Sequence, residues 1–195
     1  MPHASLPPCS VLILAGGRGQ RMGGQDKGLL PWQGRPLVSY AAALARPLSD
    51  DLIISCNRNP DEYAPYADRL VHDDSPDFPG PLAGIRAGLA VARHSHLLVL
   101  PCDAPRLDSE LLERLLQASA ESPNEVQMLR SGEQWEPLFC VIPVALGPQI
   151  EDAWQHGDRS PRHVFSQIGL QAVDCPTHDP RLANLNTPEL LYDAR

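Results

Sequence analysis

Short, continuous apolar runs alternate along the chain with longer segments in which apolar residues recur at helical spacing. Continuous apolar runs are typical of strands buried on both faces, and their alternation with helices is typical of a mainly parallel sheet. The pattern predicts strands at 10–15, 51–56, 69–73 and 96–102, and helices at 36–48, 61–67, 81–95 and 108–122. We therefore expect one sheet with helices on both of its faces.

The pattern changes after residue 124. Two apolar runs separated by a short polar stretch predict a hairpin-like pair, so at least one strand should run antiparallel. The predicted ranges are 124–130 and 135–143 for this pair, 144–156 and 161–168 for helices, 170–175 for a strand and 187–194 for a last helix. Repeats, low-complexity tracts and linkers are absent from the sequence. The prediction is a single three-layer α/β domain over 1–195, with 1–9 as a flexible lead-in.

Composition narrows the class of protein. Hydrophobic residues make up 43% of the 195 and charged residues 21%, which is typical of globular proteins. The formal net charge of −8 argues against general nucleic-acid binding. No apolar run approaches the roughly 20 residues of a membrane span, and the first ten residues do not resemble a secretion signal. We therefore expect a cytoplasmic protein that binds neither nucleic acid nor membrane.

The five cysteines are widely spaced, odd in number and without a C-x-x-C pair. This spacing argues against a disulfide framework or a structural zinc site. Three of them lie in or beside apolar runs, so small buried side chains are a better interpretation than a catalytic thiol. The cysteines are Cys9, Cys56, Cys102, Cys140 and Cys175.

The stretch LAGGRGQRMGGQDKG, residues 14–28, follows the first predicted strand and is neither of the two common glycine loops. A Walker A loop needs G-K-[ST] at its end, whereas Lys27 stands between Asp26 and Gly28. A dinucleotide fingerprint needs a third glycine where this chain has Met22. It also needs an acidic residue at the end of the second strand, where the sequence reads SCNRN.

The same stretch nevertheless has the chemistry of an anion site. Glycines let the backbone approach a ligand and turn several N–H groups toward one point. Arg21 offers a planar fork to phosphate oxygens and Lys27 a mobile point charge. Arg18, Arg21 and Lys27 against Asp26 leave residues 17–27 with a local charge of +2 on an acidic protein. A triphosphate is the natural occupant, and a tight turn with solvated charges is the alternative.

Other predicted strands also end at polar residues. Asp103 directly follows the buried run at 96–102, where a carboxylate can hold Mg²⁺ together with substrate phosphates. The alternative is a turn cap before Pro105. The helix beginning near Leu82 could direct its N-terminus toward phosphate, whereas Gly84 could instead permit close helix packing. In parallel sheets, ligands bind at the carboxyl ends of the strands, so these features should lie together.

Blocks along nearly the whole chain resemble the molybdenum cofactor guanylyltransferases, within the nucleotidyltransferase superfamily. The blocks are LAGGRGQRMGGQDKG, QGRPLV, DDSPDFPGPLAGI, LPCDAPRL, WEPLFCV, GDRSPRHVF and NLNTPELL. The first block alone would also fit sugar-phosphate or cytidylyl relatives, and the PGPLAGI and NLNTPELL blocks narrow it. The resemblance implies a Rossmann-like fold and transfer of GMP from GTP to the terminal phosphate of molybdopterin, with Mg²⁺ and release of pyrophosphate.

The resemblance also implies roles for individual residues. Those implied for catalysis are Arg21, Lys27 and Asp103, of which Asp103 carries the metal. Those implied for the nucleotide are Leu14, Ala15, Gly16, Gly17, Lys27, Ser55, Asn57, Asp74 and Asp103. Ser55 stands where the family commonly has asparagine, so either it or Asn57 contacts the nucleoside.

The side that binds the acceptor, an anionic pterin with a terminal phosphate, is implied less specifically. The residues are Leu82, Gly84, Arg159, Arg162, Asn184 and Asn186. The two arginines could equally form a solvated basic turn, and the two asparagines could serve turn and cap chemistry. Expected partners are the small-molecule substrates, molybdenum insertion proteins and client molybdoenzymes. A transferase that uses CTP or a sugar phosphate and a non-catalytic molybdopterin carrier are the alternatives.

Overall fold

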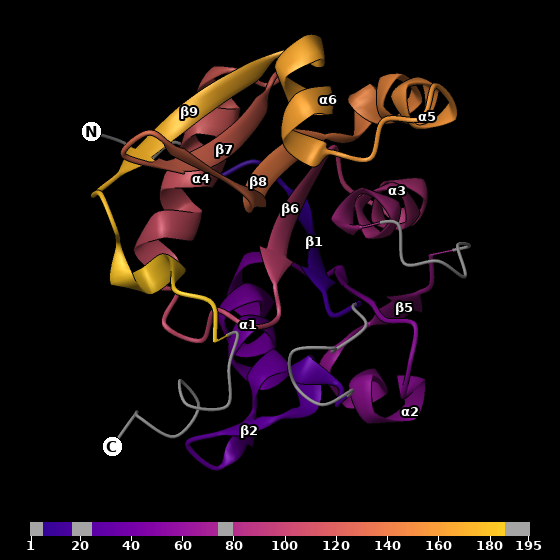
Figure 1. Cartoon of the computed structure of the whole chain (residues 1–195), viewed down its shortest axis with the longest axis vertical. Coiled ribbons are helices and arrows are strands. Elements are labelled where there is room, and N and C mark those ends of the chain that lie inside the picture. Colours follow the sequence, from indigo (N-terminus) through magenta and orange to yellow (C-terminus); the bar gives the residue numbers. More distant parts are fainter. Residues whose placement is uncertain (1–5, 17–24, 74–79, 186–195) are drawn as a thin grey trace.

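The computed structural model describes residues 6–16, 25–73 and 80–185, and its centre is a seven-stranded sheet (Figure 1). The strand order is β5-β4-β1-β6-β8-β7-β9. The strands are β1 (Cys9–Leu14), β4 (Leu52–Ser55), β5 (Arg69–Val71), β6 (His96–Pro101), β7 (Val126–Ser131), β8 (Gln134–Pro143) and β9 (Leu170–Cys175). Because β1 begins at Cys9, this residue belongs to the sheet rather than to the predicted lead-in.

The sheet is mainly parallel, as predicted. Strand β1 pairs in parallel with β4 and β6, and β4 pairs in parallel with β5. Strand β8 is antiparallel to both β6 and β7, and β7 is parallel to β9. Within the described residues β8 is therefore the one reversed strand of this sheet. The hairpin pattern after residue 124 predicted this reversal.

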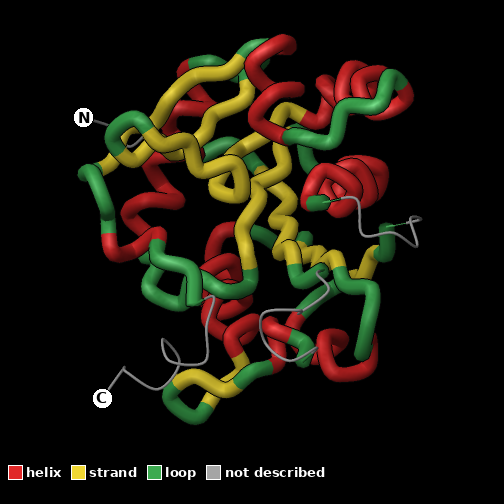
Figure 2. Tube along the Cα trace, viewed as in Figure 1, coloured by secondary structure: helices red, strands yellow, loops and turns green. Residues whose placement is uncertain are grey.

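Helices cover both faces of the sheet and make three layers (Figure 2). One face carries α1 (Leu37–Ala45), α2 (Pro60–Tyr63) and α4 (Ser109–Glu121); the other carries α3 (Pro81–Val91), α5 (Gly147–Gln155) and α6 (Pro161–Ile168). Neighbouring strand residues point to opposite faces. Thus Val11 and Ile13 pack in the core beneath α1, α2 and α4, while Leu12 packs in the core beneath α3, α5 and α6. Burial on both faces explains the continuous apolar run.

A two-stranded hairpin, β2 (Pro31–Trp32) and β3 (Arg35–Pro36), precedes α1 and was not predicted. Its turn is made by Gln33 and Gly34, both of which have positive φ. Trp32 packs with Leu37 and with Leu185 from the far end of the described chain, forming a small third core. Two-residue strands leave no periodic signal in a sequence, so this hairpin is visible only in the structure.

Helix α3 ends at Val91 rather than at the predicted residue 95. The reason is a competing set of hydrogen bonds at the amino end of the sheet. The backbone N–H groups of Arg93 and His94 donate to Ser10 Oγ at 3.0 and 3.2 Å. The Arg93 N–H group also donates to the Asp51 carboxylate. These acceptors replace the carbonyls that a longer helix would have offered.

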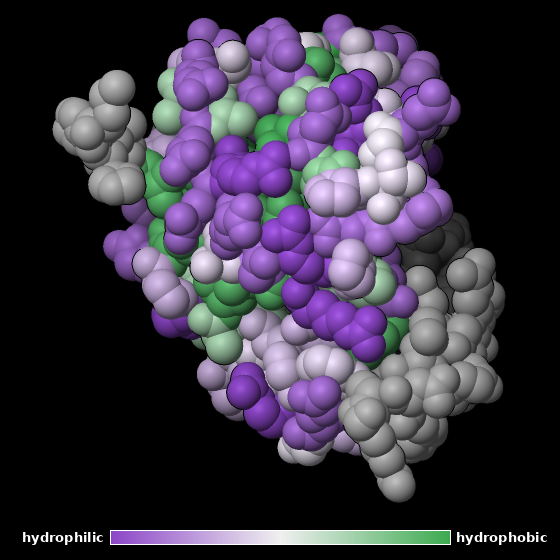
Figure 3. Space-filling model, turned by 90° about the vertical axis from the view of Figure 1, so that its left-hand side faces the viewer, coloured by the Kyte–Doolittle hydropathy of each residue, from purple (hydrophilic) through white to green (hydrophobic). Residues whose placement is uncertain are grey.

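The last predicted helix, 187–194, lies outside the described residues. Within the described part of the chain, no helix is long and apolar enough to cross a membrane. The side of the molecule that carries β9 and α4 in Figure 1 is mainly polar, with small apolar areas between polar side chains (Figure 3). Strand β9 lies at an edge of the sheet, where charged side chains such as Asp174 discourage pairing with another chain.

Asp51 is fully buried at the amino end of β4 and accepts hydrogen bonds from three directions. Ser10 Oγ donates to it at 2.5 Å, the Arg93 N–H group at 3.0 Å, and the Arg69 guanidinium forms an ion pair with it. Burial opposes ionisation, but the hydrogen bonds and the positive charge of Arg69 outweigh it and lower the pKa of Asp51. This carboxylate joins β1, the start of β4, β5 and the segment that precedes β6.

We predict that Asp51→Asn lowers the free energy of unfolding by about 2 to 3 kcal/mol at neutral pH. The folded-state pKa lies below its unfolded value, so the wild-type advantage is complete above that unfolded value. It is lost as the pH falls through the lowered folded value. Urea unfolding from pH 7 to pH 3 should therefore show the two proteins converging below about pH 4. Asp174→Asn, which removes an exposed pair with Arg130, is the control and should leave the midpoint almost unchanged.

Candidate active site

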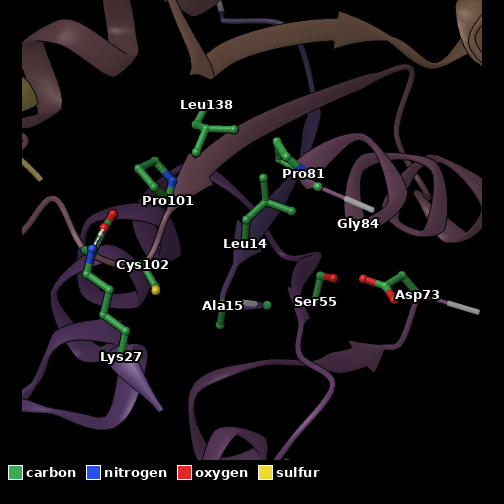
Figure 4. Close-up of a pocket in the computed structure, with 13 residues that line it drawn as sticks. Leu14, Ala15, Lys27, Ser55, Asp73, Pro81, Gly84, Pro101, Cys102 and Leu138 are labelled. Carbon is green, nitrogen blue, oxygen red and sulfur yellow. Dashed lines mark hydrogen bonds and ion pairs between the residues drawn. The ribbon is translucent and has the colours of Figure 1, made fainter. Parts of the chain in front are cut away.

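A cavity of about 370 Å³ opens at the carboxyl ends of β1, β4, β5 and β6 (Figure 4). Its walls come from the turn after β1, the ends of β4 and β6, the segment after β5 and the start of α3. The lining residues are Leu14, Ala15, Gly16, Lys27, Ser55, Asp73, Gly80, Pro81, Gly84, Pro101, Cys102, Asp103 and Leu138. Parallel strands bring their carboxyl ends to one edge, so residues far apart in the sequence meet here.

Many of the residues singled out from the sequence lie in this one cavity. Seven predicted site residues line it: Leu14, Ala15, Gly16, Lys27, Ser55, Gly84 and Asp103. Gly17, Arg21, Asp74 and Asn186 lie outside the described residues, so the roles expected for them stay predictions.

Lys27 and Asp103 form an ion pair at one side of the cavity (Figure 4). Lys27 begins the short 3-10 turn η2 (Lys27–Leu29), and Asp103 lies just past β6. Their side chains are 21% and 13% exposed, so both charges are largely shielded from water yet open to the cavity. A half-buried cation and carboxylate held together here can bind a phosphate and a metal ion, respectively.

Ser55 and Asp73 lie at the other side of the cavity and point toward one another in Figure 4. Asp73 Oδ1 is buried and has no hydrogen-bond partner among the described residues. Such an oxygen has lost its hydrogen bonds to water and gains no replacement unless a ligand donates one. This side of the cavity is therefore the natural place for a hydrogen-bond donor or a cation brought by a substrate.

Asn57 does not line the cavity but supports it from behind. Its Oδ1 accepts a hydrogen bond from the backbone N–H group of Asp73 at 3.2 Å. Its Nδ2 lies 4.0 Å from where a side chain on Gly16 would begin. Of the two candidates for the nucleoside contact, Ser55 thus faces the cavity, whereas Asn57 orients Asp73.

Asp73 lines the cavity although it was not among the predicted site residues, whereas the role expected for the neighbouring Asp74 lies outside the described residues and stays a prediction. Strand β5 ends at Val71, and Asp73 follows two residues later at the carboxyl edge. The position of a carboxylate relative to the strand end could have indicated Asp73. The end of a three-residue strand is, however, poorly fixed by sequence, because tertiary pairing decides where it stops.

Gly84 is a packing glycine at the wall of the cavity. A Cβ on Gly84 would lie 2.7 Å from Leu14 Cδ2 and 2.9 Å from Ser55 Oγ. The bare backbone therefore lets α3 approach β1 and β4 closely. This favours the packing alternative stated for Gly84, and it sets the width of the cavity at the same time.

A bulge in β8 brings Leu138 over the cavity. Met128 of β7 pairs with Cys140, but the next residue, Leu129, pairs with Glu136. Residues 137–139 therefore lie opposite no residue of β7, and the strand bends outward there. Leu138 reaches the cavity next to Pro101 (Figure 4). Nothing in the local sequence indicates this contact.

Cys102 lines the cavity but is poorly suited to be a nucleophile. Burial, and then the neighbouring Asp103 carboxylate, raise the pKa of its thiol well above the usual range. The thiol therefore stays neutral. It is inert because the thiolate is the reactive form. All five cysteines are free and buried, which confirms the burial predicted for Cys56, Cys102 and Cys140 and adds Cys9 and Cys175.

Apart from Gly84, the described residues predicted for the acceptor do not line the cavity. Leu82 is fully buried in the core that α3 forms with the sheet, and it does not line the cavity. Arg159 stacks on the Trp154 ring at 3.7 Å, and Arg86 lies over the same ring at 4.3 Å. The Arg159 carbonyl lies 4.0 Å from where a side chain on Gly80 would begin, so this loop borders the cavity.

Arg162 is exposed on α6 and does not line the cavity. The segment around Asn184, in contrast, contacts Asp103 at the wall of the cavity. The backbone N–H group of Leu185 donates to the Asp103 carbonyl at 2.9 Å, and Asn184 Oδ1 is buried without a partner in the described chain. The asparagine thus lies beside the residue that was predicted to hold the metal.

The class of protein follows from this geometry together with the family that the sequence matches. Residues 11–174 match the family model described as the MobA-like NTP transferase domain, so the cavity at the carboxyl edge belongs to a nucleotidyltransferase. The protein called molybdenum cofactor guanylyltransferase in Pseudomonas paraeruginosa is 69% identical, covering 98% of this chain and 96% of that one. The protein of that name in Pseudomonas aeruginosa strain PAO1 is 66% identical, covering 100% and 98%. This chain belongs to the molybdenum cofactor guanylyltransferases.

Solved structures show the same fold at low identity. The molybdopterin-guanine dinucleotide biosynthesis protein A of Archaeoglobus fulgidus superposes with a TM-score of 0.74 at 21% identity, covering 94% of this chain and 95% of that one. The 2-C-methyl-D-erythritol 4-phosphate cytidylyltransferase of Thermus thermophilus gives 0.69 at 16%, covering 95% and 96%. These structures confirm the Rossmann-like fold, and the family match and the curated relatives confirm the family resemblance.

We predict that Gly84→Ala both destabilises the protein and raises the KM for nucleotide by about 10-fold. Overpacking of this kind costs about 1 to 3 kcal/mol, and here it displaces Leu14 and Ser55 at the cavity wall. Thermal unfolding and initial rates measure the two effects.

Gly88→Ala is the matched control for this prediction. A Cβ on Gly88 would lie 2.7 Å from Leu12 Cδ2, so the same helix is overpacked against the same strand but away from the cavity. It should lower stability to a similar degree and leave the KM unchanged. Equal effects of both variants on the KM would contradict a role for Gly84 in shaping the site.

Proposed function

We propose that this chain transfers GMP from GTP to the terminal phosphate of molybdenum-bearing molybdopterin, releasing pyrophosphate and forming the guanine dinucleotide form of the cofactor. The observation that carries the proposal is the Lys27–Asp103 ion pair beside the Leu14–Gly16 turn, at the carboxyl edge of a nucleotidyltransferase sheet. The relatives called molybdenum cofactor guanylyltransferase match this chain almost end to end, which supports the same substrates.

The triphosphate would lie along the backbone of residues 14–16, with Lys27 next to it. Backbone N–H groups at a glycine turn and a lysine ammonium supply donors and positive charge without requiring a specific base. Arg21, outside the described residues, would add a second cation. Ser55 and Asp73, on the far side of the cavity, would hold the nucleoside, and Asn57 would fix the backbone of Asp73.

The residues present fit a magnesium ion. Mg²⁺ is usually bound through one or two carboxylates together with substrate phosphates. Asp103 offers one carboxylate in the cavity, beside the Leu14–Gly16 turn where the phosphates would lie. Asp103 would hold the ion together with oxygens of the substrate phosphates. When bound, Mg²⁺ would neutralise charge on the phosphates.

The chemistry requires no nucleophile from the protein. An oxygen of the acceptor's terminal phosphate attacks the α-phosphorus of GTP and forms a P–O bond, while the bond from that phosphorus to the β-phosphate oxygen breaks. The electron pair leaves with pyrophosphate. The protein positions the two substrates and stabilises the charge that develops, which are the two effects that dominate phosphoryl transfer. The neutral Cys102 thiol takes no part.

The acceptor would approach over the segment that carries Asn184, because this segment is tied to the Asp103 backbone. Asn186 follows it in sequence. Arg159 lies over the Trp154 ring in the loop beside Gly80 and would supply positive charge to the pterin phosphate. Arg162 on α6 would supply a second positive charge. Gly84 and Leu82 would act on this side through packing. We further infer a cytoplasmic enzyme that receives its acceptor from molybdenum insertion proteins and hands its product to client molybdoenzymes.

Pyrophosphate release tests the proposed substrates. With molybdopterin as acceptor, GTP should support release at least about 10-fold faster than CTP, because the base is read by hydrogen bonds that the wrong base leaves unpaired. Faster release with CTP would indicate a cytidylyl transferase, and release only with a sugar phosphate would indicate the other rival. A carrier would bind molybdopterin but release no pyrophosphate with either nucleotide.

We predict that Lys27→Ala lowers turnover by about 100-fold or more, the usual effect of removing one preorganised charge donor from an acyl or phosphoryl transfer site. Steady-state rates with saturating GTP measure it, and a melting curve checks that the variant is folded. Near-normal turnover in a folded variant would remove Lys27 from the mechanism.

We predict that Asp103→Asn folds normally but needs a higher Mg²⁺ concentration for half-maximal rate. Asparagine keeps the size of the side chain and loses the negative charge that binds a hard cation. A magnesium titration of the initial rate makes the comparison. If the titration curve of the variant overlaid that of the wild type, Asp103 would not be the metal ligand.

A further inference from the structure

A cluster of polar groups lies beneath the Lys27 turn and is not accounted for by substrate binding. Tyr63, the last residue of α2, is fully buried, and its hydroxyl donates to Asp26 Oδ1 at 2.5 Å. Asn59, at the start of the same helix, donates from Nδ2 to Asp26 Oδ2 at 3.1 Å. Both oxygens of the Asp26 carboxylate are therefore held by one short helix.

The backbone around this cluster is shaped to fit it. Asn59 has φ 48°, a left-handed conformation that turns its amide toward Asp26 instead of capping α2. Gly28 passes directly over the tyrosine, and a Cβ there would lie 2.5 Å from the Tyr63 hydroxyl oxygen. A left-handed asparagine and a glycine without room for a methyl group show how tightly the turn is seated on α2.

The arrangement separates two charges that are adjacent in sequence. Asp26 and Lys27 are neighbours, and a carboxylate next to an ammonium would compete with phosphate for it. Here Asp26 has its own donors on α2, while the Lys27 ammonium group pairs with Asp103. The backbone of the turn is closed between them, because the Leu29 N–H group donates to the Asp26 carbonyl at 3.1 Å.

Tyr63 is suited to be a permanent donor in this cluster. Burial, together with the hydrogen bond to Asp26 and the negative charge of that carboxylate, raises the pKa of its hydroxyl far above the usual range. The hydroxyl therefore stays protonated at neutral pH, and its hydrogen bond to a carboxylate is charge-assisted.

We propose that Asp26, Asn59 and Tyr63 form a latch that positions Lys27 for the transfer reaction. Tyr63 and Asn59 are positioning residues, because they act on the lysine through Asp26 and touch no substrate. The inference rests on the role proposed above for Lys27. It adds that α2, outside the cavity wall, sets where the ammonium group stands.

The test is Tyr63→Phe, which removes the hydroxyl and keeps the buried ring. We expect the kcat to fall about 10-fold and the KM for GTP to change less than about 3-fold, because a displaced donor loses more in the transition state than in the ground state. Asn59→Gly should give a smaller fall in kcat, since glycine accepts the left-handed backbone without strain.

Tyr66→Phe is the matched control. Tyr66 is half-buried three residues later in the chain, and no described residue accepts a hydrogen bond from its hydroxyl. This variant should turn over at the wild-type rate. Melting temperatures of all variants show whether any loss of rate reflects unfolding.

A double-mutant cycle separates positioning from general damage. In the Lys27→Ala background, Tyr63→Phe should lower the remaining rate by less than about 2-fold, because no lysine is left to position. An undiminished 10-fold loss in that background would overturn the latch. So would a wild-type kcat for Tyr63→Phe alongside an inactive Lys27→Ala. An active Lys27→Ala would instead refute the proposed role of Lys27 itself.

Discussion

The ion pair between Lys27 and Asp103 is the interaction on which the arrangement of the site depends. It joins the short turn η2, which begins at Lys27, to the segment just past β6. These two segments lie far apart in the sequence. In the described structure each charge is the other's partner, so neither is buried unpaired. A phosphate can bind Lys27, or a metal ion can bind Asp103. In either case the other charged group still faces the cavity rather than the apolar core.

The two members of the pair are held from opposite sides by unrelated segments. Lys27 is held through Asp26 by α2. Asp103 is held through its backbone by Leu185, whose side chain packs with Trp32 and Leu37 in the small third core. The hairpin before α1 and the C-terminal segment thus share one apolar contact beside the site. Rigid support of this kind is what positioning catalysis requires, because a shift of about 1 Å can cost 100-fold in rate.

The sequence was sufficient to predict which strand ends meet at one edge of the sheet, but not the contacts that support them. Apolar runs locate strands, and the carboxyl ends of parallel strands meet at one edge, so Gly16, Ser55 and Asp103 could be placed together before the structure was known. The contacts of Tyr63 with Asp26 and of Leu138 with the cavity depend on tertiary packing and on a bulge, which have no local pattern. The place of Asp73 in the cavity wall has a related cause, because pairing with β4 decides where the short strand β5 ends.

Two carboxylates at opposite ends of the sheet differ in the number of hydrogen-bond donors that surround them. At the amino end, Asp51 is surrounded by a hydroxyl, a backbone N–H group and a guanidinium, which leave it little capacity for a ligand. At the carboxyl end, the Asp73 side chain keeps an oxygen without a donor among the described residues, in a cavity large enough for a substrate. Satisfying the first stabilises the fold, whereas leaving the second unsatisfied costs stability that a bound ligand restores. The same residue type is therefore fully hydrogen-bonded at one edge and keeps an acceptor available at the other.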